Sequence, residues 1–510
     1  MKFHELDRGA IARARLRLSE EDGEVATNSL AYTWPWRSDW YTMEFGECAG
    51  CGVFRFHFNG RTYYSLPFGS GDKSTVLREL FTGAVAKIID ESTNRRVDES
   101  GTVPAFGLLS ETDVAALGPG WLVRELPELA DYIYSARELA ELKGTKFQQK
   151  RNFTHRFEKL GEWKYVELAA MDAAAFERDA RAVLEAWIAG KTERNEELYV
   201  EIRALELVLA ALGRGEGDAL AAATGGVLYS LGRPVAFALG EPISRRMILE
   251  SYEKAVPGVP GAFPTVTREF CRAALRGGYE FVNRAGADGN ENLVKAKESW
   301  HPARKAPRYR AVKTRVEFAT AADRPALAAL WHEIFGDSPR AIDYFLGSIF
   351  GDSPRQNRRI DESTNRRIDK STNRRIDEFL KGGYTLVLRE AGEIASACFF
   401  LDLPDDVRYV YALMTRPVSR GKGYAREILS AAMALDLATF AVVPGEKSLV
   451  PFYESLGFAV SSPAEKREIA LDDFAREFYR LDGVDGTVTC ELPTMTFPPS
   501  PGYRVEVPLN

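Results

Sequence analysis

The sequence predicts an α/β (α+β) protein built from several mixed sheets in succession. Segments that alternate apolar and polar residues, as half-buried strands do, recur between stretches with apolar residues at helical spacing. The 510 residues suggest three domains, because a single domain averages about 150 residues. A strand, a glycine-rich loop and a helix follow one another over 408–436, an order that presents backbone amides to a phosphate.

The composition is that of an ordinary soluble globular protein, with 45% hydrophobic and 27% charged residues. The formal net charge of -6 argues against wholesale nucleic-acid binding but allows a local basic groove. The first ten residues carry charges where a signal peptide needs an apolar run, and no stretch of 18 apolar residues occurs. We therefore expect no membrane span and a cytoplasmic location.

The five cysteines are too few for a disulfide framework. Cys48 and Cys51 form a C-x-x-C, but a zinc site needs a second pair of ligands and only His57 is close. We predict no metal site and two half-buried thiols on a turn.

Two stretches of short repeats interrupt the α/β pattern. Residues 357–380 repeat the motif NRRIDEST with a period of eight, and a related copy occupies 89–100. One apolar residue per repeat buries too little surface to offset the entropy of ordering the segment. We predict that both stretches are surface insertions, the second one spanning 351–380. The alternative, that their arginine pairs bind nucleic acid, is weakened by the acidic residues beside each pair.

The elements predicted before residue 312 begin with two strands around the Asn59-Gly60 turn, within 53–66. Ala, Leu and Glu at helical spacing then predict two helices around Gly190. The pattern restarts near Pro307–Thr314, which predicts a domain boundary. In chain order the remaining predicted elements are helices within 174–212, a strand pair over 225–240, a helix over 264–277 and a strand over 279–283.

After the boundary the pattern predicts a second α/β unit with a glycine-rich loop near its centre. A strand and a helix capped near Thr320 are followed by three strands, the loop, a helix from Tyr424, a further strand and a last helix. The predicted segments are 317–335, 384–389, 394–401, 408–415, 424–436, 438–443 and the stretch beginning at Pro451.

The loop between the strand at 408–415 and the next helix is suited to a diphosphate. Gly421 and Gly423 let the backbone approach a ligand with no Cβ in the way, and the helix N-terminus adds about half a positive charge. Hydrogen bonds to a charged group contribute about 1.5–3 kcal/mol each, so several amides can anchor a diphosphate. The predicted cofactor-binding loop residues are Arg420, Gly421, Lys422, Gly423, Tyr424 and Ala425.

These residues fit the acyl-CoA loop pattern Gln/Arg-x-x-Gly-x-Gly/Ala, and the region resembles the GNAT acetyltransferase superfamily. Pro451–Phe458 (PFYESLGF) contains the Phe-Tyr-x-x-x-Gly-Phe ending common in that superfamily. The resemblance implies acetyl-CoA or another acyl-CoA as cofactor and an amine acceptor, either a small molecule or a peptide. It implies that Tyr453 protonates the leaving thiolate, and that backbone amides at Leu413, Met414 and Thr415 bind the acyl group. The structural alternative is that Tyr453 only packs on an amphipathic helix.

Transfer to a neutral amine needs a general base, directly or through water. The strand at 408–415 contains no carboxylate, which leaves Asp405 and Asp406 just before it as candidates.

The first 312 residues carry a different set of short motifs. They are Gln149–Phe157 with a dense group of basic residues, Tyr252–Ala255, Phe281–Arg284 and Leu293–Trp300. In this order they resemble soluble relatives of the phosphatidylglycerol lysyltransferase C-terminal domain, the DUF2156 group. The resemblance implies two GNAT-like folds in tandem and a phosphorylated donor such as an aminoacyl-tRNA. The substrate residues that it implies are Lys150, Arg151, Asn152, Arg156, Glu253, Lys254, Asn283, Arg284, Lys295 and Lys297.

Together the patterns predict three GNAT-like mixed-sheet units. Residues 1–312 form a tandem pair, divided near 150, residues 313–462 form an acyltransferase domain, and 463–510 form an extension. The predicted function is acyl-CoA-dependent N-acyl transfer. The alternatives are aminoacyl-tRNA-dependent transfer in the N-terminal module, or a sensor that binds an acyl-CoA or phosphorylated metabolite without turnover.

Overall fold

The computed structural model describes residues 1–18, 23–36, 38, 41–58, 61–86, 105–192, 195–214, 222–350, 383–463, 467–470, 487–490 and 492–498. It divides into two compact units. One contains Met1–Gly83, Phe106–Leu117 and Val123–Ala311, and the other contains Ala84–Ala105, Gly118–Leu122 and Val312–Asn510. The predicted insertions at 89–100 and 351–380 and most of the extension lie outside the described residues.

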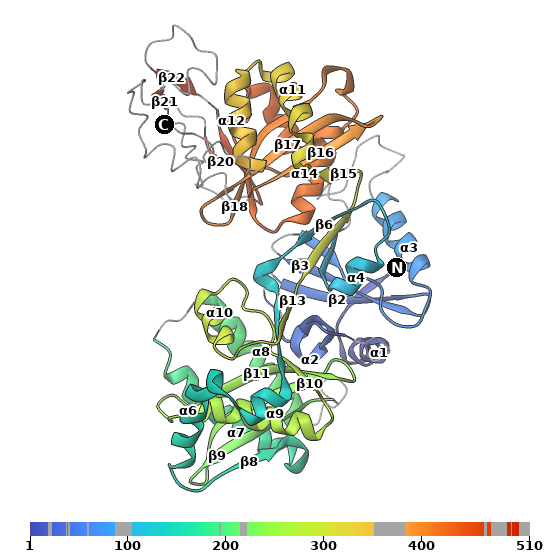
Figure 1. The fold of residues 1–510 in the computed structure, drawn as a ribbon. Helices are drawn as coiled ribbons and strands as arrows, with labels where there is room; N and C mark the ends of the chain where they lie inside the picture. The colour runs from blue at the N-terminus through green and yellow to red at the C-terminus, as the bar shows by residue number, and fades with distance from the viewer. Residues whose placement is uncertain are drawn as a thin grey trace, which may run out of the picture. The chain divides into compact units, whose positions relative to one another are not determined.

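Three seven-stranded sheets follow one another along the chain, which confirms the predicted α/β class (Figure 1). The first has the order β1-β2-β3-β4-β5-β14-β6, the second β13-β7-β12-β11-β10-β9-β8, and the third β15-β16-β17-β18-β19-β23-β20. When the second sheet is followed from β8 to β13, each sheet begins with five strands in chain order. One strand from another place in the chain comes next, and a seventh strand completes the sheet. The three sheets therefore share one topology.

The first sheet takes its inserted strand from the far end of the N-terminal module. The second sheet contains β7 to β13, which follow one another in the chain, whereas β14 comes after all of them and completes the first sheet. The first sheet is therefore complete only when the chain that follows the second sheet returns to it.

The first sheet is formed together with four helices from the same stretch of chain. Its strands are β1 (Phe3–Glu5), β2 (Tyr41–Cys48), β3 (Cys51–Phe58), β4 (Arg61–Tyr64), β5 (Ala105–Leu109), β6 (Trp121–Glu125) and β14 (Tyr309–Lys313). Its helices are α1 (Arg8–Leu18), α2 (Leu30–Thr33), α3 (Lys73–Ala86) and α4 (Glu111–Ala116).

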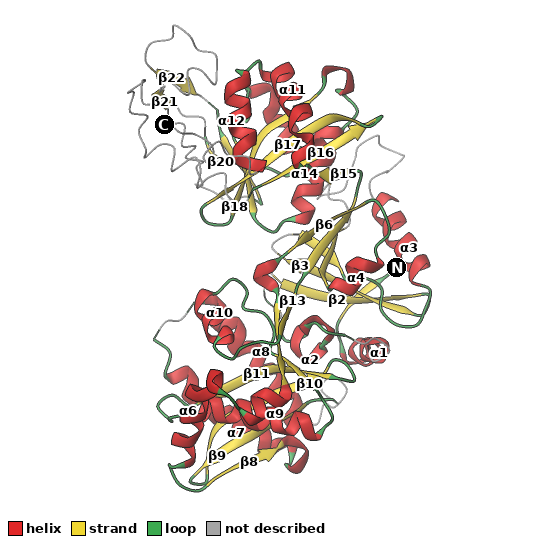
Figure 2. Cartoon of the chain, in the orientation of Figure 1, coloured by secondary structure: helices red, strands yellow, loops and turns green. Residues whose placement is uncertain are grey.

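The second sheet is covered by helices on both faces (Figure 2). Its strands are β7 (Asp131–Ser135), β8 (Trp163–Glu167), β9 (Thr224–Ser230), β10 (Arg233–Pro242), β11 (Met247–Ala255), β12 (Phe281–Asn283) and β13 (Arg304–Ala306). Its helices are α5 (Ala136–Glu141), α6 (Gln148–Glu158), α7 (Ala173–Ala189), α8 (Glu196–Gly213), α9 (Ala262–Arg276) and α10 (Glu291–Glu298). The predicted helix pair around Gly190 is confirmed as α7 and α8.

Helix α9 supplies the apolar face that fills the core of the second sheet. Val266, Phe270 and Ala274, spaced four residues apart, lie on one side of the helix and are buried against β10 and β11. Helix α7 also contacts β10 and β11 and belongs to no part of this core cluster, so it lies on the opposite face.

The third sheet is also covered on both faces. Its strands are β15 (Val316–Phe318), β16 (Tyr384–Glu390), β17 (Glu393–Leu403), β18 (Val407–Thr415), β19 (Thr439–Val442), β20 (Ala459–Ser462) and β23 (Thr494–Phe497). Its helices are α11 (Arg324–Phe335), α12 (Pro339–Phe350), α14 (Tyr424–Leu435) and α15 (Val450–Glu454), and β21 (Arg467–Ala470) pairs with β22 (Thr487–Cys490) separately. Trp331 and Phe345 pack on Phe399 of β17, and no described residue of α14 belongs to this cluster, so α14 covers the other face.

No helix in the described part of the chain is long and apolar enough to cross a membrane.

Candidate functional site

The glycine turn before α14 presents uncommitted backbone amides to open space. Gly421 and Gly423 have φ of 77° and 81°, a conformation that side chains disfavour, and a Cβ at either would meet no atom within 4 Å. Residues 420–423 are exposed. Within the described structure the amides of Gly421, Lys422 and Gly423 donate no backbone hydrogen bond, and those of Tyr424 and Ala425 open the 12-residue helix. The turn therefore offers five adjacent donors to an anion.

The cations around the turn differ in their contacts. Lys422 Nζ lies 2.5 Å from Glu390 Oε1 at the end of β16, and Ser419 Oγ donates to the other oxygen of that carboxylate at 2.9 Å. Arg420 makes only a long contact, 3.4 Å from Nε to the Thr415 carbonyl, and is exposed. Arg420 is therefore the loop cation best placed to turn toward a phosphate.

Strand β18 has an open edge directly beside this turn. Only Val407, Arg408 and Tyr409 pair with the parallel strand β19, so the two strands part beyond that point. Opposite Cys398 of β17, β18 contains an extra residue, and Ala412 there adopts a φ of 48°. Such a bulge redirects backbone amides, which makes the predicted segment Leu413–Thr415 a place where a carbonyl group can be bound.

Tyr453 lies on α15, next to the start of α14. Arg426, in the first turn of α14, donates to the Ser455 carbonyl at 3.1 Å and so ties the two helices together. Tyr453 is 5% exposed. Burial, followed by the neighbouring Cys398 and Tyr409, raises the pKa of its phenol well above the usual range. The phenol is therefore protonated at neutral pH, as an ordinary phenol is, and burial makes it a weaker acid.

The structure corrects the candidates for the general base. Asp405 and Asp406 form the exposed turn of the β17–β18 hairpin, with φ of 63° and 54°. They lie at the opposite end of β18 from the bulge, about 20 Å away for six residues of strand. A carboxylate at that distance cannot take a proton from an amine at the bulge, so neither residue is the base.

A second group of charged residues lies against the second sheet, where Arg284, Glu250 and Glu253 have buried side chains and Lys150 and Lys297 are partly buried. Arg284 at the end of β12 makes ion pairs with both Glu250 and Glu253 of β11. Lys297 of α10 donates to the Arg284 carbonyl, and Lys150 of α6 lies 4.3 Å from the ring of Trp300, as an ammonium–aromatic contact. Lys150, Glu253, Arg284 and Lys297, all predicted from sequence, are thus brought together, and Glu250 joins them.

A bulge in β11 explains why both glutamates face the same way. Tyr252 pairs with Leu239 but Glu250 pairs with Gly240, so Ser251 is an extra residue. Residues three apart on a regular strand point to opposite faces, and the extra residue puts Glu250 and Glu253 on one face. Sequence alone gives no signal for this bulge, which is why Glu250 was missed. Its Oε1 atom is buried and has no hydrogen-bond partner among the described residues.

Burial shifts the pKa values of this cluster toward one another. Burial, then the Glu250 carboxylate, raises the pKa of Glu253 to about 8. Burial, then the Arg284 charge, lowers the pKa of Lys150 and of Lys297 to about 8. Groups perturbed in this way mark candidate functional sites.

These shifts predict that stability depends on pH in both directions. A folded Glu253 keeps a proton that the unfolded chain releases above pH 4.5, so stability falls as the pH rises to about 8. The lysines make stability change with pH in the opposite direction. Between about pH 8 and 10.5 the unfolded chain holds protons that the folded state has lost, so stability rises with pH. Urea unfolding of the full chain should show a minimum near pH 8, and Glu253→Gln should remove the fall below it. A fall in Glu253→Gln equal to that of the unmodified chain contradicts this assignment.

The other residues predicted for the N-terminal site lie elsewhere. Arg151 donates to the Leu142 and Gly144 carbonyls, where it holds the preceding turn in place. Lys254 is on the other face of β11, 2.7 Å from Glu201 of α8, and the buried Asn283 amide donates to Asp131. Their polar groups are already engaged, which corrects their grouping with Arg284. Asn152 and Arg156 are exposed on α6, and Lys295 is exposed on α10, 3.6 Å from Glu291.

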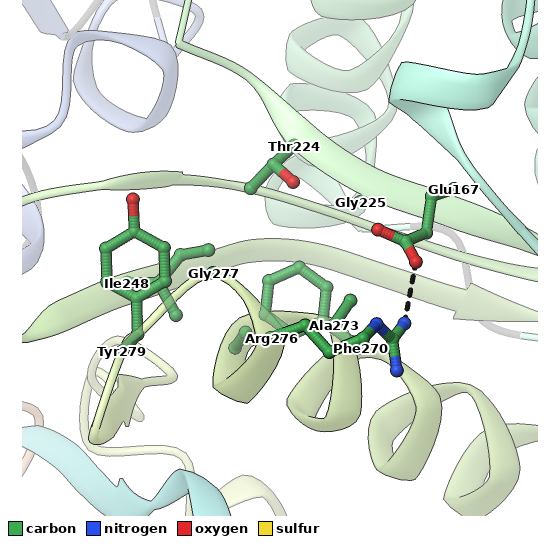
Figure 3. Close-up of a pocket in the computed structure, with 10 residues that line it drawn as sticks. Glu167, Thr224, Gly225, Ile248, Phe270, Ala273, Arg276, Gly277 and Tyr279 are labelled. Carbon is green, nitrogen blue, oxygen red and sulfur yellow. Dashed lines mark hydrogen bonds and ion pairs between the residues drawn. The ribbon is translucent and has the colours of Figure 1, made fainter.

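A pocket of about 280 Å³ opens between α9 and the second sheet, close to β8 and β9 (Figure 3). Ile248 and Phe270 form part of its apolar lining, and the Glu167–Arg276 ion pair, 2.6 Å long, lies at its side. Thr224 of this pocket and Glu250 both pair with Gly240 of β10, so the pocket lies two strands away from Glu250 in the same row of the sheet. None of the predicted site residues lines it.

Cys48 and Cys51 face each other across the two-residue turn between β2 and β3. Cys48 Sγ lies 2.7 Å from Glu79, and burial raises the pKa of the Cys51 thiol. Among the described residues no group of three His, Cys, Asp or Glu side chains could hold a metal ion.

Two known protein families match different parts of the chain. The family described as phosphatidylglycerol lysyltransferase, C-terminal, matches residues 26–312, more than half of the chain, so the chain belongs to this family. The acetyltransferase (GNAT) domain family matches residues 354–471. Two modules of the acyltransferase type are therefore fused in one chain. No curated protein matched.

Solved structures resemble different parts of the chain. A conserved protein of unknown function from Bacteroides thetaiotaomicron is 26% identical over 62% of this chain and 100% of its own, with a TM-score of 0.52. L-PGS from Bacillus licheniformis is 17% identical over 59% of this chain and 91% of its own, with a TM-score of 0.42. The ribosomal-protein-S18-alanine N-acetyltransferase from Escherichia coli is 14% identical over 36% of this chain and 90% of its own, with a TM-score of 0.22.

Proposed function

We propose that the domain spanning 313–462 transfers the acyl group of an acyl-CoA to an amine, which is either a small molecule or a peptide terminus. The observation that carries the proposal is the exposed turn at Gly421–Gly423, whose amides have no other described partner and which starts a 12-residue helix. A Cβ at either glycine would occupy the open space above the amides, so the turn suits a ligand that approaches the backbone closely.

Each part of this site has a role in the proposed transfer. The amides of 421–425, with Arg420, would hold the cofactor diphosphate. Bound acyl-CoA would supply an activated thioester carbonyl, and the redirected amides at the β18 bulge would bind its oxygen. Tyr453 is protonated at Oη at neutral pH and would give this proton to the departing thiolate.

Direct titration tests this proposal. The full chain should bind CoA, and it should release free thiol from acetyl-CoA when a suitable amine is supplied from a panel. CoA binding without thiol release for any amine would favour the sensor alternative, and absence of CoA binding would remove the cofactor assignment.

Replacing Tyr453 with phenylalanine should slow turnover about a hundredfold and leave CoA affinity nearly unchanged. The substitution keeps the buried ring and removes only the acidic hydroxyl, and general acids contribute on the order of 10²–10⁴ in rate. Tyr384→Phe, which removes the hydroxyl of a tyrosine on β16, is the matched control and should leave the rate unaltered. A Tyr453→Phe rate equal to that of the control returns Tyr453 to a packing role.

A second candidate function is favoured by the buried cluster around Arg284. Lys150, Arg284 and Lys297 bring three cations to one place, a suitable site for the phosphate or ester end of a charged tRNA. If residues 1–312 act on such a donor, Lys150→Ala should weaken the binding of aminoacyl-tRNA, whereas Lys295→Ala, on the exposed side of α10, should not. Equal binding by both variants opposes this function.

A further inference from the structure

The carboxylate of Glu390 is the feature of the cofactor loop that the transfer mechanism leaves unexplained. Three side chains of the loop turn toward it: Lys422 at 2.5 Å, Ser419 at 2.9 Å and the hydroxyl of Tyr424. Lys422 Nζ also lies 5.9 Å from the Tyr424 ring. A fixed negative charge thus lies next to amides that are suited to a diphosphate.

We propose that Glu390 is a positioning residue that sets cofactor affinity by holding Lys422 away from the diphosphate. The inference rests on the proposed function. While Lys422 is paired, its ammonium lies against Glu390 at the end of β16, so the loop offers the diphosphate its amides and Arg420 alone. The carboxylate itself repels an approaching diphosphate.

The substitution Glu390→Gln separates the effect of Glu390 on the shape of the loop from its effect on Lys422. Its amide oxygen can still accept hydrogen bonds from Ser419 and Tyr424, so the loop keeps its shape, but its neutral side chain releases Lys422. The ion pair is exposed, with side chains 44% and 38% accessible, so its strength is that of a surface pair. We therefore expect Glu390→Gln to tighten CoA binding about fivefold and to lower the KM for acyl-CoA equally, with kcat unchanged.

Three comparisons make the test specific. The gain should disappear in Glu390→Gln/Lys422→Gln, because it needs the released ammonium. It should shrink at high salt, where exposed charges are screened. Glu393→Gln is the control. It removes a carboxylate at the start of β17 that lies 3.6 Å from Arg416, and it should leave CoA affinity unaltered.

Calorimetric titration of CoA into the full-length variants gives the decisive readings. Weaker or equal binding by Glu390→Gln, or a gain that persists without Lys422, overturns the inference while leaving the cofactor site in place. If neither the unmodified chain nor Glu390→Gln binds CoA, the proposed function fails, and this outcome is distinguishable from the first. A gain confined to kcat also overturns the inference, because Glu390 would then act on chemistry rather than on affinity.

Discussion

Gly423→Asn should weaken CoA binding about a hundredfold while leaving the domain folded. Asparagine tolerates the left-handed backbone better than other side chains, so the turn at φ of 81° can be kept. Its side chain would fill the empty space over the amides, where a Cβ at present meets nothing within 4 Å. Losing two charge-assisted hydrogen bonds of about 1.5–3 kcal/mol each accounts for a loss of this size. Valine would be a poorer probe because it strains the backbone.

Gly336→Asn is the matched control for this substitution. Gly336 ends α11 with a φ of 73° and also has open space beyond its Cα, but it is not part of the loop. Both variants should unfold at similar urea concentrations, and only Gly423→Asn should lose CoA in a calorimetric titration. Normal CoA affinity in Gly423→Asn would falsify the assignment of the diphosphate to this turn.

Removing Arg284 should destabilise the N-terminal module by about 3–5 kcal/mol, the usual cost of leaving a buried charge without its partner. Arg284 is the shared partner of two glutamates whose side chains are 1% accessible at Glu250 and 6% accessible at Glu253. In Arg284→Met the loss should be smallest at low pH and grow as the pH rises, since at low pH both glutamates carry protons and leave no uncompensated charge.

Urea unfolding of the full chain measures this effect. Arg246→Met serves as the control because Arg246 pairs with Glu280 through side chains 65% and 55% accessible, and it should change stability by less than about 0.5 kcal/mol. Adding Glu250→Gln and Glu253→Gln to Arg284→Met should restore much of the lost stability. A loss for Arg284→Met no larger than that of the control would show that the cluster is hydrated rather than buried.

The sequence was a good guide to the elements of the third sheet because each is marked by residues next to one another in the chain. The strands at 384–389 and 394–401 and the helix from Tyr424 are confirmed as β16, β17 and α14. The return of β14 to the first sheet carries no local signal. It depends on which sheet each strand pairs with, and such pairings join residues far apart in the chain.

The candidate sites differ in the same way: one is formed by residues that are neighbours in the chain, and the other by residues that are far apart. The glycine turn is a contiguous string, so its exposure and free amides agree with the pattern read from sequence. The cluster around Arg284 is assembled from β11, β12, α6 and α10, and short basic motifs could not separate Lys150 from Arg151 or Glu253 from Lys254. Residues adjacent in sequence point in opposite directions on a strand, and a single bulge brought in Glu250.

The most direct measurement compares CoA with phosphopantetheine, which keeps the thiol arm and one phosphate but lacks the second phosphate and the nucleotide, in titrations of the full chain and of Gly423→Asn, in which the preference for CoA should be lost. If backbone donors at Gly421–Gly423 grip the diphosphate, CoA binds with one site per chain and phosphopantetheine binds about a hundredfold more weakly. Equal affinity for the two ligands, or no affinity for CoA, contradicts the account.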